Sequence, residues 1–361
     1  MAQNRQYSLD VLKFLATSII IFHHYQLETG FASESLPNWF GGRFYWGYLV
    51  ELFFLLSGYF AFSSVAKIKT STEAANYLKR KYMRFLPLLV FCGLLDLLFG
   101  YIQVRIGATH ELAAGSQFSY THWGIFASLL GIYRWVSTSL SVNYPTWYVS
   151  VLLLCCIVCV IANLIGRKTK LSPTALLLCP IVIGLIMKGL LANGATPVPF
   201  FNDSIARGLI SFFTGSLVKA LADKQPLFTR LPCTIAAISL ITFAFAYAKG
   251  GHWIGSDFDL YCSVAFIAAP SLLFIFNSQF VQRALSHKCL RNLGAISYST
   301  FMWHLIFIRI LMIIAHVTNL PLIGYPQMIA FTCICFLLGA FSTKYLEPNL
   351  NNLFSNTHLT S

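Results

Sequence analysis

The chain has 361 residues, of which 57% are apolar and only 10% are charged. Soluble domains carry roughly 25% charged residues, so this composition excludes a protein that exposes most of its surface to water. The formal net charge of +13 could indicate nucleic-acid binding, but the cations are distributed along the chain as they are in membrane proteins.

Continuous apolar stretches recur along the chain, and each is roughly 17–20 residues long, the length that a helix needs to cross a bilayer. Strands of a membrane barrel would alternate apolar and polar residues instead. We therefore expect an all-α fold, a polytopic membrane bundle of about ten helices, because lipid requires every backbone group to be satisfied internally. The expected spans are residues 9–27, 46–64, 85–104, 146–165, 174–192, 205–222, 232–249, 259–277, 295–315 and 326–345.

These spans form a single membrane domain over residues 1–347, followed by a polar tail over residues 348–361. No small-residue cleavage site follows the first span, so we interpret it as a helix that is retained. The ten cysteines lie mostly inside apolar stretches, where a cysteine packs as a small hydrophobe. No pair has metal-ligand spacing with a histidine nearby, so we expect neither disulfides nor a metal site.

The connection between the second and third spans is strongly basic, which predicts that it is cytoplasmic. Its cations are Lys67, Lys69, Lys79, Arg80, Lys81 and Arg84. Two spans precede this connection, so the N-terminus is expected on the same side.

One further apolar stretch, residues 123–136, is short, and the cations decide whether it crosses. If it does not cross, both termini are cytoplasmic, and so are Arg5, Lys13, Arg167, Lys168, Lys170, Lys219, Lys224, Arg230, Arg283, Lys288, Arg291 and Lys344. The cations left on the far side are Arg43, Arg105, Arg134, Arg207 and Lys249. We therefore place residues 123–136 on the outer face, or re-entering it.

The first span carries ionisable residues, which are costly in a membrane and usually face a cavity or a partner. Lys13 and His24 are eleven residues apart, so they lie within about 20° of one helix face and about 16 Å apart along the axis. His23 lies about 80° from that face, so phase favours His24 as the partner of Lys13. The alternative is that Lys13 reaches the cytoplasmic interface and His24 caps the outer end of the helix.

Glu51 begins the second span, and a basic cluster precedes the third. Arg80 and Arg84 are four residues apart and can present one helix face, and with Lys81 they are suited to a phosphate-bearing ligand. Ordinary positive-inside charge, or contact with anionic lipid, is the alternative interpretation.

The ninth span places a serine, a tyrosine and a histidine on one membrane helix. Ser297 and His304 are seven residues apart and therefore share a face. A lone histidine on an apolar helix is more often a hydrogen-bonded structural residue than a catalyst, so both roles stay open for His304.

Seven short motifs follow one another from one end of the chain to the other. They are Lys13-x10-His24, Phe53-Phe54-x-x-Ser57-Gly58-Tyr59, the basic residues 80–87, Thr146-Trp147-Tyr148, Arg207-Gly208-Leu209-x-x-Phe212-Phe213-x-Gly215, Ile296-Ser297-Tyr298-x-x-Phe301-x-Trp303-His304 and Tyr345-x-Glu347-Pro348. Each is weak alone, but together and in this order they resemble the acyltransferase-3 family of membrane O-acyltransferases.

The resemblance implies a multi-pass enzyme of the bacterial inner membrane that moves an acetyl group from acetyl-CoA, used from the cytoplasmic side, to a hydroxyl acceptor. The acceptor is commonly a cell-surface carbohydrate such as O-antigen, capsule or another exopolysaccharide. No permanently bound cofactor, no metal, no nucleic-acid partner and no appended hydrolase-like domain are expected. The family's first motif has an arginine where this chain has Lys13, which keeps the charge but loses the bidentate fork. The family's Arg-x-x-Arg motif is matched by Lys81-x-x-Arg84.

The resulting hypothesis is acyl transfer with His24 as general base on the acceptor hydroxyl and with Lys13 or Glu51 orienting the site. Direct transfer and an acyl-histidine intermediate both stay open. The alternatives are transport of an acyl group or glycan without chemistry, and a structural subunit of an envelope complex. The donor-binding candidates are Arg80, Lys81 and Arg84, and the candidates for substrate binding or structure are Ser57, Trp147, Arg207, Tyr298 and His304.

Overall fold

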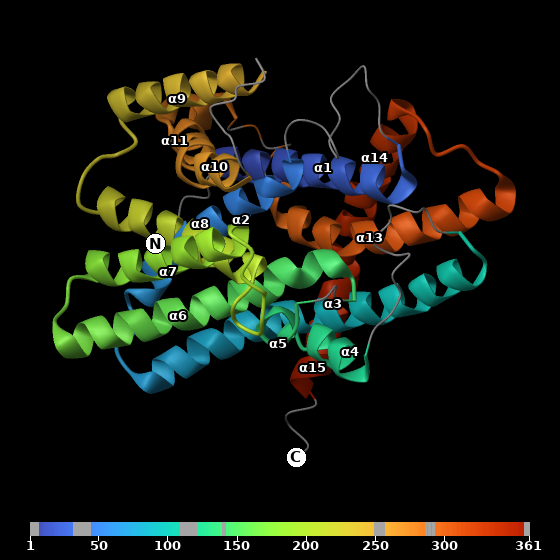
Figure 1. Ribbon diagram of the computed structural model, residues 1–361, viewed down its shortest axis with the longest axis horizontal. Coiled ribbons are helices and arrows are strands. Elements are labelled where there is room, and N and C mark those ends of the chain that lie inside the picture. The colour runs from blue at the N-terminus through green and yellow to red at the C-terminus, as the bar shows by residue number, and fades with distance from the viewer. Residues whose placement is uncertain are drawn as a thin grey trace.

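The computed structural model describes residues 7–31, 45–108, 121–138, 142–248, 257–285, 287, 290 and 293–356. This part of the chain is predominantly helical and contains no strand, only an isolated bridge between Val198 and Phe201. The all-α prediction is confirmed, and Figure 1 shows the long helices gathered into a bundle. The helices are α1 (Tyr7–Thr29), η1 (Trp46–Leu49), α2 (Val50–Val65), α3 (Ser71–Arg105), α4 (His122–Leu129), α5 (Tyr133–Val136), η3 (Tyr144–Thr146), α6 (Trp147–Thr169), α7 (Pro173–Ala192), α8 (Asp203–Ala222), α9 (Arg230–Ala248), α10 (Asp257–Ser263), η4 (Val264–Ala268), α11 (Ala269–Asn277), α12 (Gln279–Ala284), α13 (Leu293–Thr318), α14 (Tyr325–Phe341), η6 (Ser342–Leu346) and α15 (Glu347–Asn356).

Within the described residues, eight helical segments are long and apolar enough to cross a membrane, which confirms a polytopic membrane bundle. The other two predicted spans are also helices, α1 and α9. Asp10, Lys13 and two histidines interrupt the apolar sequence of α1, and the apolar part of α9 over Arg230–Phe245 is short. The eight segments are Trp46–Val65, Ser71–Arg105, Tyr144–Thr169, Pro173–Ala192, Asp203–Ala222, Phe258–Asn277, Leu293–Thr318 and Tyr325–Phe354.

The orientation of the bundle in the membrane stays a prediction from the positive-inside rule. Five cations used in that prediction, Arg5, Arg43, Lys249, Lys288 and Arg291, lie outside the described residues. The polar tail predicted from residue 348 begins as the helix α15, and residues 357–361 lie outside the described part.

The short apolar stretch over residues 123–136 forms two small helices instead of a span. They are α4, with eight residues, and α5, with four. Gly131 breaks the stretch between them with a positive φ of 69°, which a glycine adopts without steric cost. At 1.5 Å per residue neither helix can cross a bilayer, so the prediction that this stretch does not cross agrees with the structure.

Of the basic residues before the third predicted span, Lys79, Arg80, Lys81 and Arg84 are helical, so α3 begins well before residue 85, while Lys67 and Lys69 precede it. Thr70 caps it by accepting a hydrogen bond from the Glu73 N–H, 3.2 Å away, and the Glu73 carboxylate accepts one from the Lys69 N–H at 2.7 Å. This reciprocal capping starts the helix, and lysine and arginine continue it because they are good helix formers. The basic cluster therefore stands on a rigid helix and not in a loop.

Helices α2 and α8 approach each other closely enough for their backbones to touch. A Cβ added to Gly58 would lie 1.8 Å from the carbonyl oxygen of Phe212, and one added to Gly215 would lie 1.9 Å from that of Leu55. The Ser-Gly-Tyr and Phe-x-Gly motifs thus meet across this contact, which small residues make possible in membrane bundles.

Gly58→Ala is expected to destabilise the protein by at least about 1–3 kcal/mol, because the added methyl group overpacks a backbone contact that cannot yield. Thermal unfolding of the purified protein in detergent measures the effect. Gly189→Ala on α7 is the matched control, because no atom lies within 4 Å of its added Cβ. Equal losses of stability in the two variants would contradict the close approach of α2 and α8.

Candidate functional site

A cavity of about 190 Å³ lies between α1, α2, α3, α6 and α13. Five of the seven sequence motifs contribute to its wall, although they are distributed over most of the chain. One part of the lining is cationic, one part is hydroxylic and the remainder is apolar or aromatic. The cations and hydroxyl groups are Lys13, Lys81, Arg84, Ser57, Tyr148, Ser297 and Tyr298.

The cationic part of the cavity combines one residue from α1 with two from α3. Lys81 and Arg84 are three residues apart and share a helix face. The Nζ atom of Lys13 lies 3.7 Å from Asp10 Oδ1 and 5.3 Å from the centre of the Phe60 ring. Three cations around one small cavity favour an anionic ligand. Arg80, the third predicted donor-binding residue, is exposed on α3 and does not line the cavity.

The hydroxyl groups of the cavity come from α2, α6 and α13. Ser57 Oγ and Tyr148 Oη are 3.0 Å apart, and Tyr148 also donates to the Phe53 carbonyl oxygen at 3.3 Å. The hydroxyl of Tyr298 is buried and has no hydrogen-bond partner among the described residues. A buried polar group without a partner is costly, so this hydroxyl is available to a polar atom of a ligand.

One face of α13 connects the cavity to a second cluster of polar residues. Ser297 and Phe301 line the cavity, and His304 follows at the next turn of the same face. The Phe301 ring centre is 5.5 Å from that of His304. Phe301 therefore adjoins both the cavity and this histidine.

His24 of α1 faces His304, with 5.0 Å between their ring centres. Its Nδ1 atom lies 2.7 Å from the hydroxyl of Tyr144, and Tyr144 donates to Glu28 Oε1 at 3.2 Å. Imidazole, phenol and carboxylate thus form a chain along which a proton could be passed. His24 is turned into the protein and not toward lipid.

A buried ion pair fixes the turn that presents Tyr144. The Asn143 backbone is left-handed, with φ 47°, and its N–H donates to Asp96 Oδ2 at 2.8 Å. The Asn143 side-chain amide donates to the Met302 carbonyl oxygen at 3.0 Å, and Asp96 is paired with Arg309 of α13. These contacts tie α3, α13 and the start of η3 together directly beside His24.

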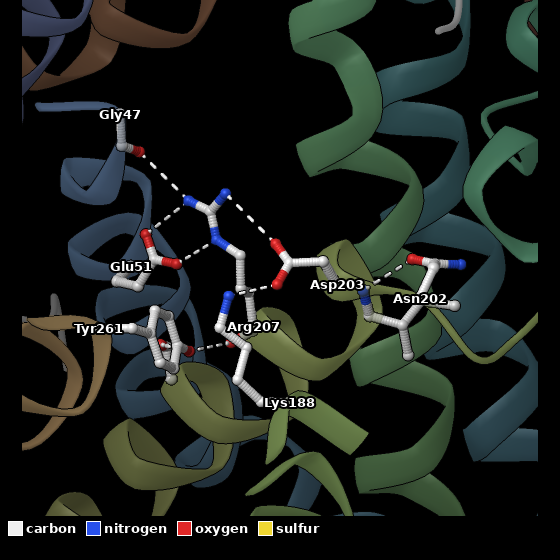
Figure 2. Close-up of polar contacts among 9 residues, drawn as sticks. Gly47, Glu51, Lys188, Asn202, Asp203, Arg207 and Tyr261 are labelled. Atoms are coloured by element: carbon white, nitrogen blue, oxygen red, sulfur yellow. Dashed lines mark hydrogen bonds and ion pairs between the residues drawn. The ribbon is translucent and has the colours of Figure 1, made fainter. Parts of the chain in front are cut away.

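A second buried ion pair joins α2 to α8. The guanidinium of Arg207 donates two hydrogen bonds to the Glu51 carboxylate and one, at 3.2 Å, to the Gly47 carbonyl oxygen (Figure 2). The Trp147 and Tyr48 rings lie 4.8 and 5.2 Å from the guanidinium carbon, which allows cation–π attraction. Bidentate pairing and two ring faces therefore compensate a charge buried in an apolar bundle.

The same network continues along the first turn of α8 toward solvent. Asp203 contacts both Lys188 and Arg207, and half of its side chain is exposed. Asn202 caps α8 by accepting from the Ile205 N–H at 3.1 Å, as Figure 2 shows for this group. The network has two cations, Lys188 and Arg207, and two carboxylates, those of Asp203 and Glu51. It therefore carries no net charge.

Aromatic contacts place this network at the same end of the bundle as the imidazoles. Tyr48, beside Arg207, has its ring centre 5.0 Å from that of Tyr45. Tyr45 is 5.1 Å from His23, which is 5.2 Å from His24. The site thus has two parts, a cationic cavity and a cluster of imidazoles, with Phe301 between them.

The structure brings together some of the predicted site residues and separates others. Lys13 is at the cavity, while His24 is at the imidazole cluster. Glu51 contacts neither, because it is paired with Arg207. Among the remaining candidates, Ser57 and Tyr298 line the cavity, Trp147 lies against Arg207, and His304 faces His24.

Sequence reasoning missed Glu28, Tyr144 and Asn143. Glu28 could have been found, since it follows His24 by four residues and lies one helical turn away. Tyr144 gave no such signal, because only the folded chain brings η3 against α1. Tyr148 belonged to a recognised motif but was not predicted as a cavity residue.

The described residues contain no group of three histidine, cysteine or acidic side chains that could hold a metal ion. Every described cysteine is a free thiol. Cys289 lies outside the described residues.

The chain matches a known family. Residues 6–344, which are nearly the whole chain, match the model of a family described as an acyltransferase domain. No curated protein and no solved structure matches the chain.

Proposed function

The chain belongs to the acyltransferase-3 family, and we propose that it is a membrane O-acetyltransferase that moves an acetyl group from acetyl-CoA to a hydroxyl of a cell-surface carbohydrate. The family supports acyl transfer in general. The donor is proposed from the resemblance together with the cationic lining of the cavity, and the acceptor is proposed from the resemblance.

The cationic cavity is the observation that carries the proposal. Coenzyme A bears phosphates at one end and the thioester at the other, and Lys81 and Arg84 offer charge-assisted hydrogen bonds to phosphate. The wall beyond them is apolar and hydroxylic, with Ser57, Tyr148 and Tyr298 available to the amides of the pantetheine arm. The thioester then lies deepest, next to Phe301.

His24 is proposed as the general base for the acceptor hydroxyl. An imidazole can take a proton near neutral pH, and the chain from His24 through Tyr144 to Glu28 can disperse the resulting charge. The acceptor approaches from the end of the bundle that carries Tyr45 and the Arg207 network, opposite the cationic cavity. Donor and acceptor therefore reach the reacting groups from different ends.

Transport without chemistry is less well supported by the structure. Intramembrane charges of a transporter line its substrate path. Here Arg309 is paired with Asp96, Arg207 with Glu51, and Lys188 with Asp203. These ion pairs join α13 to α3, α8 to α2 and α7 to α8, so the charges stabilise helix contacts.

The proposal is tested with the purified protein in lipid nanodiscs, radiolabelled acetyl-CoA and a surface-glycan fraction as acceptor. We expect CoA release together with label on the glycan. The double variant Lys81→Glu/Arg84→Glu is expected to raise the KM for acetyl-CoA by at least about 100-fold, because each lost charge-assisted hydrogen bond is worth about 1.5–3 kcal/mol.

Lys168→Glu is the matched control, because it reverses an exposed cation that does not line the cavity. The KM of this control for acetyl-CoA is expected to stay unchanged. Binding of acetyl-CoA without any CoA release would contradict the enzyme and favour a transporter. If the double variant and the control had equal KM values for acetyl-CoA, the assignment of the cavity as the donor site would be contradicted.

A further inference from the structure

His304 is held in one tautomer by its own helix. Its Nδ1 atom lies 2.6 Å from the carbonyl oxygen of Phe301, and a carbonyl can only accept a hydrogen bond. Nδ1 therefore carries the proton, and the lone pair is on Nε2. The Nε2 atom is buried and has no hydrogen-bond partner among the described residues.

An unpartnered nitrogen lone pair in a buried site is costly and calls for an explanation. A histidine that only stabilised the fold would be expected to use both ring nitrogens. Fixing Nδ1–H on a carbonyl is also how proteins aim the other nitrogen of an imidazole at a reacting atom. The arrangement thus leaves Nε2 oriented, desolvated and available.

The position of His304 relates it to the thioester side of the site. It continues the face of α13 on which Ser297 and Phe301 line the cavity, about 4.5 Å further along the axis than Phe301 at 1.5 Å per residue. The Phe301 ring lines this cavity, and its centre is 5.5 Å from that of His304. The hydrogen bond to His304 uses the Phe301 backbone, so a rotation of the ring about χ1 would leave this hydrogen bond in place.

We propose that His304 is a nucleophile that carries the acyl group between the thioester and the acceptor, so that two histidines divide the reaction. This proposal rests on the proposed acyltransferase function. Nε2 of His304 takes the acyl group at the cavity side, and His24, 5.0 Å away between ring centres, activates the acceptor. Either histidine alone reaches one substrate, while the pair reaches both.

The two steps balance. In the first, the Nε2 lone pair bonds to the acyl carbon, the carbon–sulfur bond breaks, and CoA leaves as a thiolate. The acyl-imidazolium keeps its proton on Nδ1, which still donates to the Phe301 carbonyl oxygen. In the second step, His24 takes the proton of the acceptor hydroxyl, the oxygen bonds to the acyl carbon, and the bond to Nε2 breaks. The proton held by His24 is finally released and neutralises the CoA thiolate.

Isotope exchange between labelled CoA and unlabelled acetyl-CoA, without acceptor, tests the first step alone. An acyl-enzyme returns its acyl group to labelled CoA, whereas direct transfer gives no exchange. We expect exchange in the wild type and in His24→Ala, and a loss of about 100-fold or more in His304→Gln. His316→Gln, at an exposed position of the same helix, is the matched control and is expected to exchange normally.

Acetyl-CoA binding, measured by calorimetry, shows whether His304→Gln retains its folded donor site. The proposal is supported if the wild type shows exchange and if His304→Gln binds acetyl-CoA but shows no exchange. A wild-type protein that acetylates the acceptor but shows no exchange overturns the acyl-histidine and leaves the acyltransferase function intact. Exchange at the wild-type rate in His304→Gln overturns it as well. If the wild type shows no exchange and no transfer, the enzymatic function itself is refuted.

Discussion

Replacing His24 by alanine is expected to lower kcat for acetyl transfer by about 10²–10⁴-fold, the usual contribution of a positioned general base. The variant removes the imidazole that contacts the Tyr144–Glu28 pair. The KM for acetyl-CoA is expected to change little, because the donor cavity does not include this residue. Steady-state kinetics with saturating acceptor measures both constants.

Two further variants separate chemistry from structure at this position. Tyr144→Phe keeps the ring beside His24 and removes the hydroxyl, so a smaller loss of kcat is expected. His122→Ala, at the exposed start of α4, is expected to leave both constants unchanged. Undiminished transfer by His24→Ala would remove this residue from the mechanism.

Arg207→Ala is expected to destabilise the protein by about 3–5 kcal/mol, because it leaves the carboxylate of Glu51 buried without its partner. Glu51 has no exposed surface, and its carboxylate accepts two hydrogen bonds from the Arg207 guanidinium. The double variant Glu51→Gln/Arg207→Met removes both charges and is expected to recover most of the loss. Thermal unfolding in detergent gives the comparison.

The partly exposed pair between Lys219 and Asp223 is the reference for this experiment. Surface pairs contribute about 0–1 kcal/mol, so Lys219→Ala is expected to have a small effect. A double variant as unstable as Arg207→Ala would mean that the stacked rings of Trp147 and Tyr48, and not the charge, account for the stabilisation.

The sequence predicted the helices well because their signal is local. Hydrophobicity over about twenty residues identifies a span without reference to any other part of the chain. The basic start of α3 was harder to predict, since its helix depends on the capping exchange between Thr70 and Glu73 and not on apolar length. Cation positions also decided correctly against a span over residues 123–136, where hydrophobicity alone was ambiguous.

The candidate site was predicted less completely, because its contacts join distant segments. Helical spacing placed Lys13 and His24 on one face, yet it could not show that Phe301 and His304 of α13 would lie against that face. Glu51 was assigned to the reacting groups on its charge alone. Its partner, Arg207, is 156 residues away and becomes visible only when α2 and α8 pack together.

The apolar ring of Phe301 bears on the voltage and the proton gradient that the membrane maintains. A bilayer holds a voltage and a proton gradient, and a column of water through the protein would discharge both. In the part of the chain that the structure describes, the apolar ring of Phe301 lines the cavity and packs beside the His304 imidazole. Under the proposed function, the protein would admit the highly charged donor partway into the lipid layer and pass on a small neutral group, without opening a path for ions.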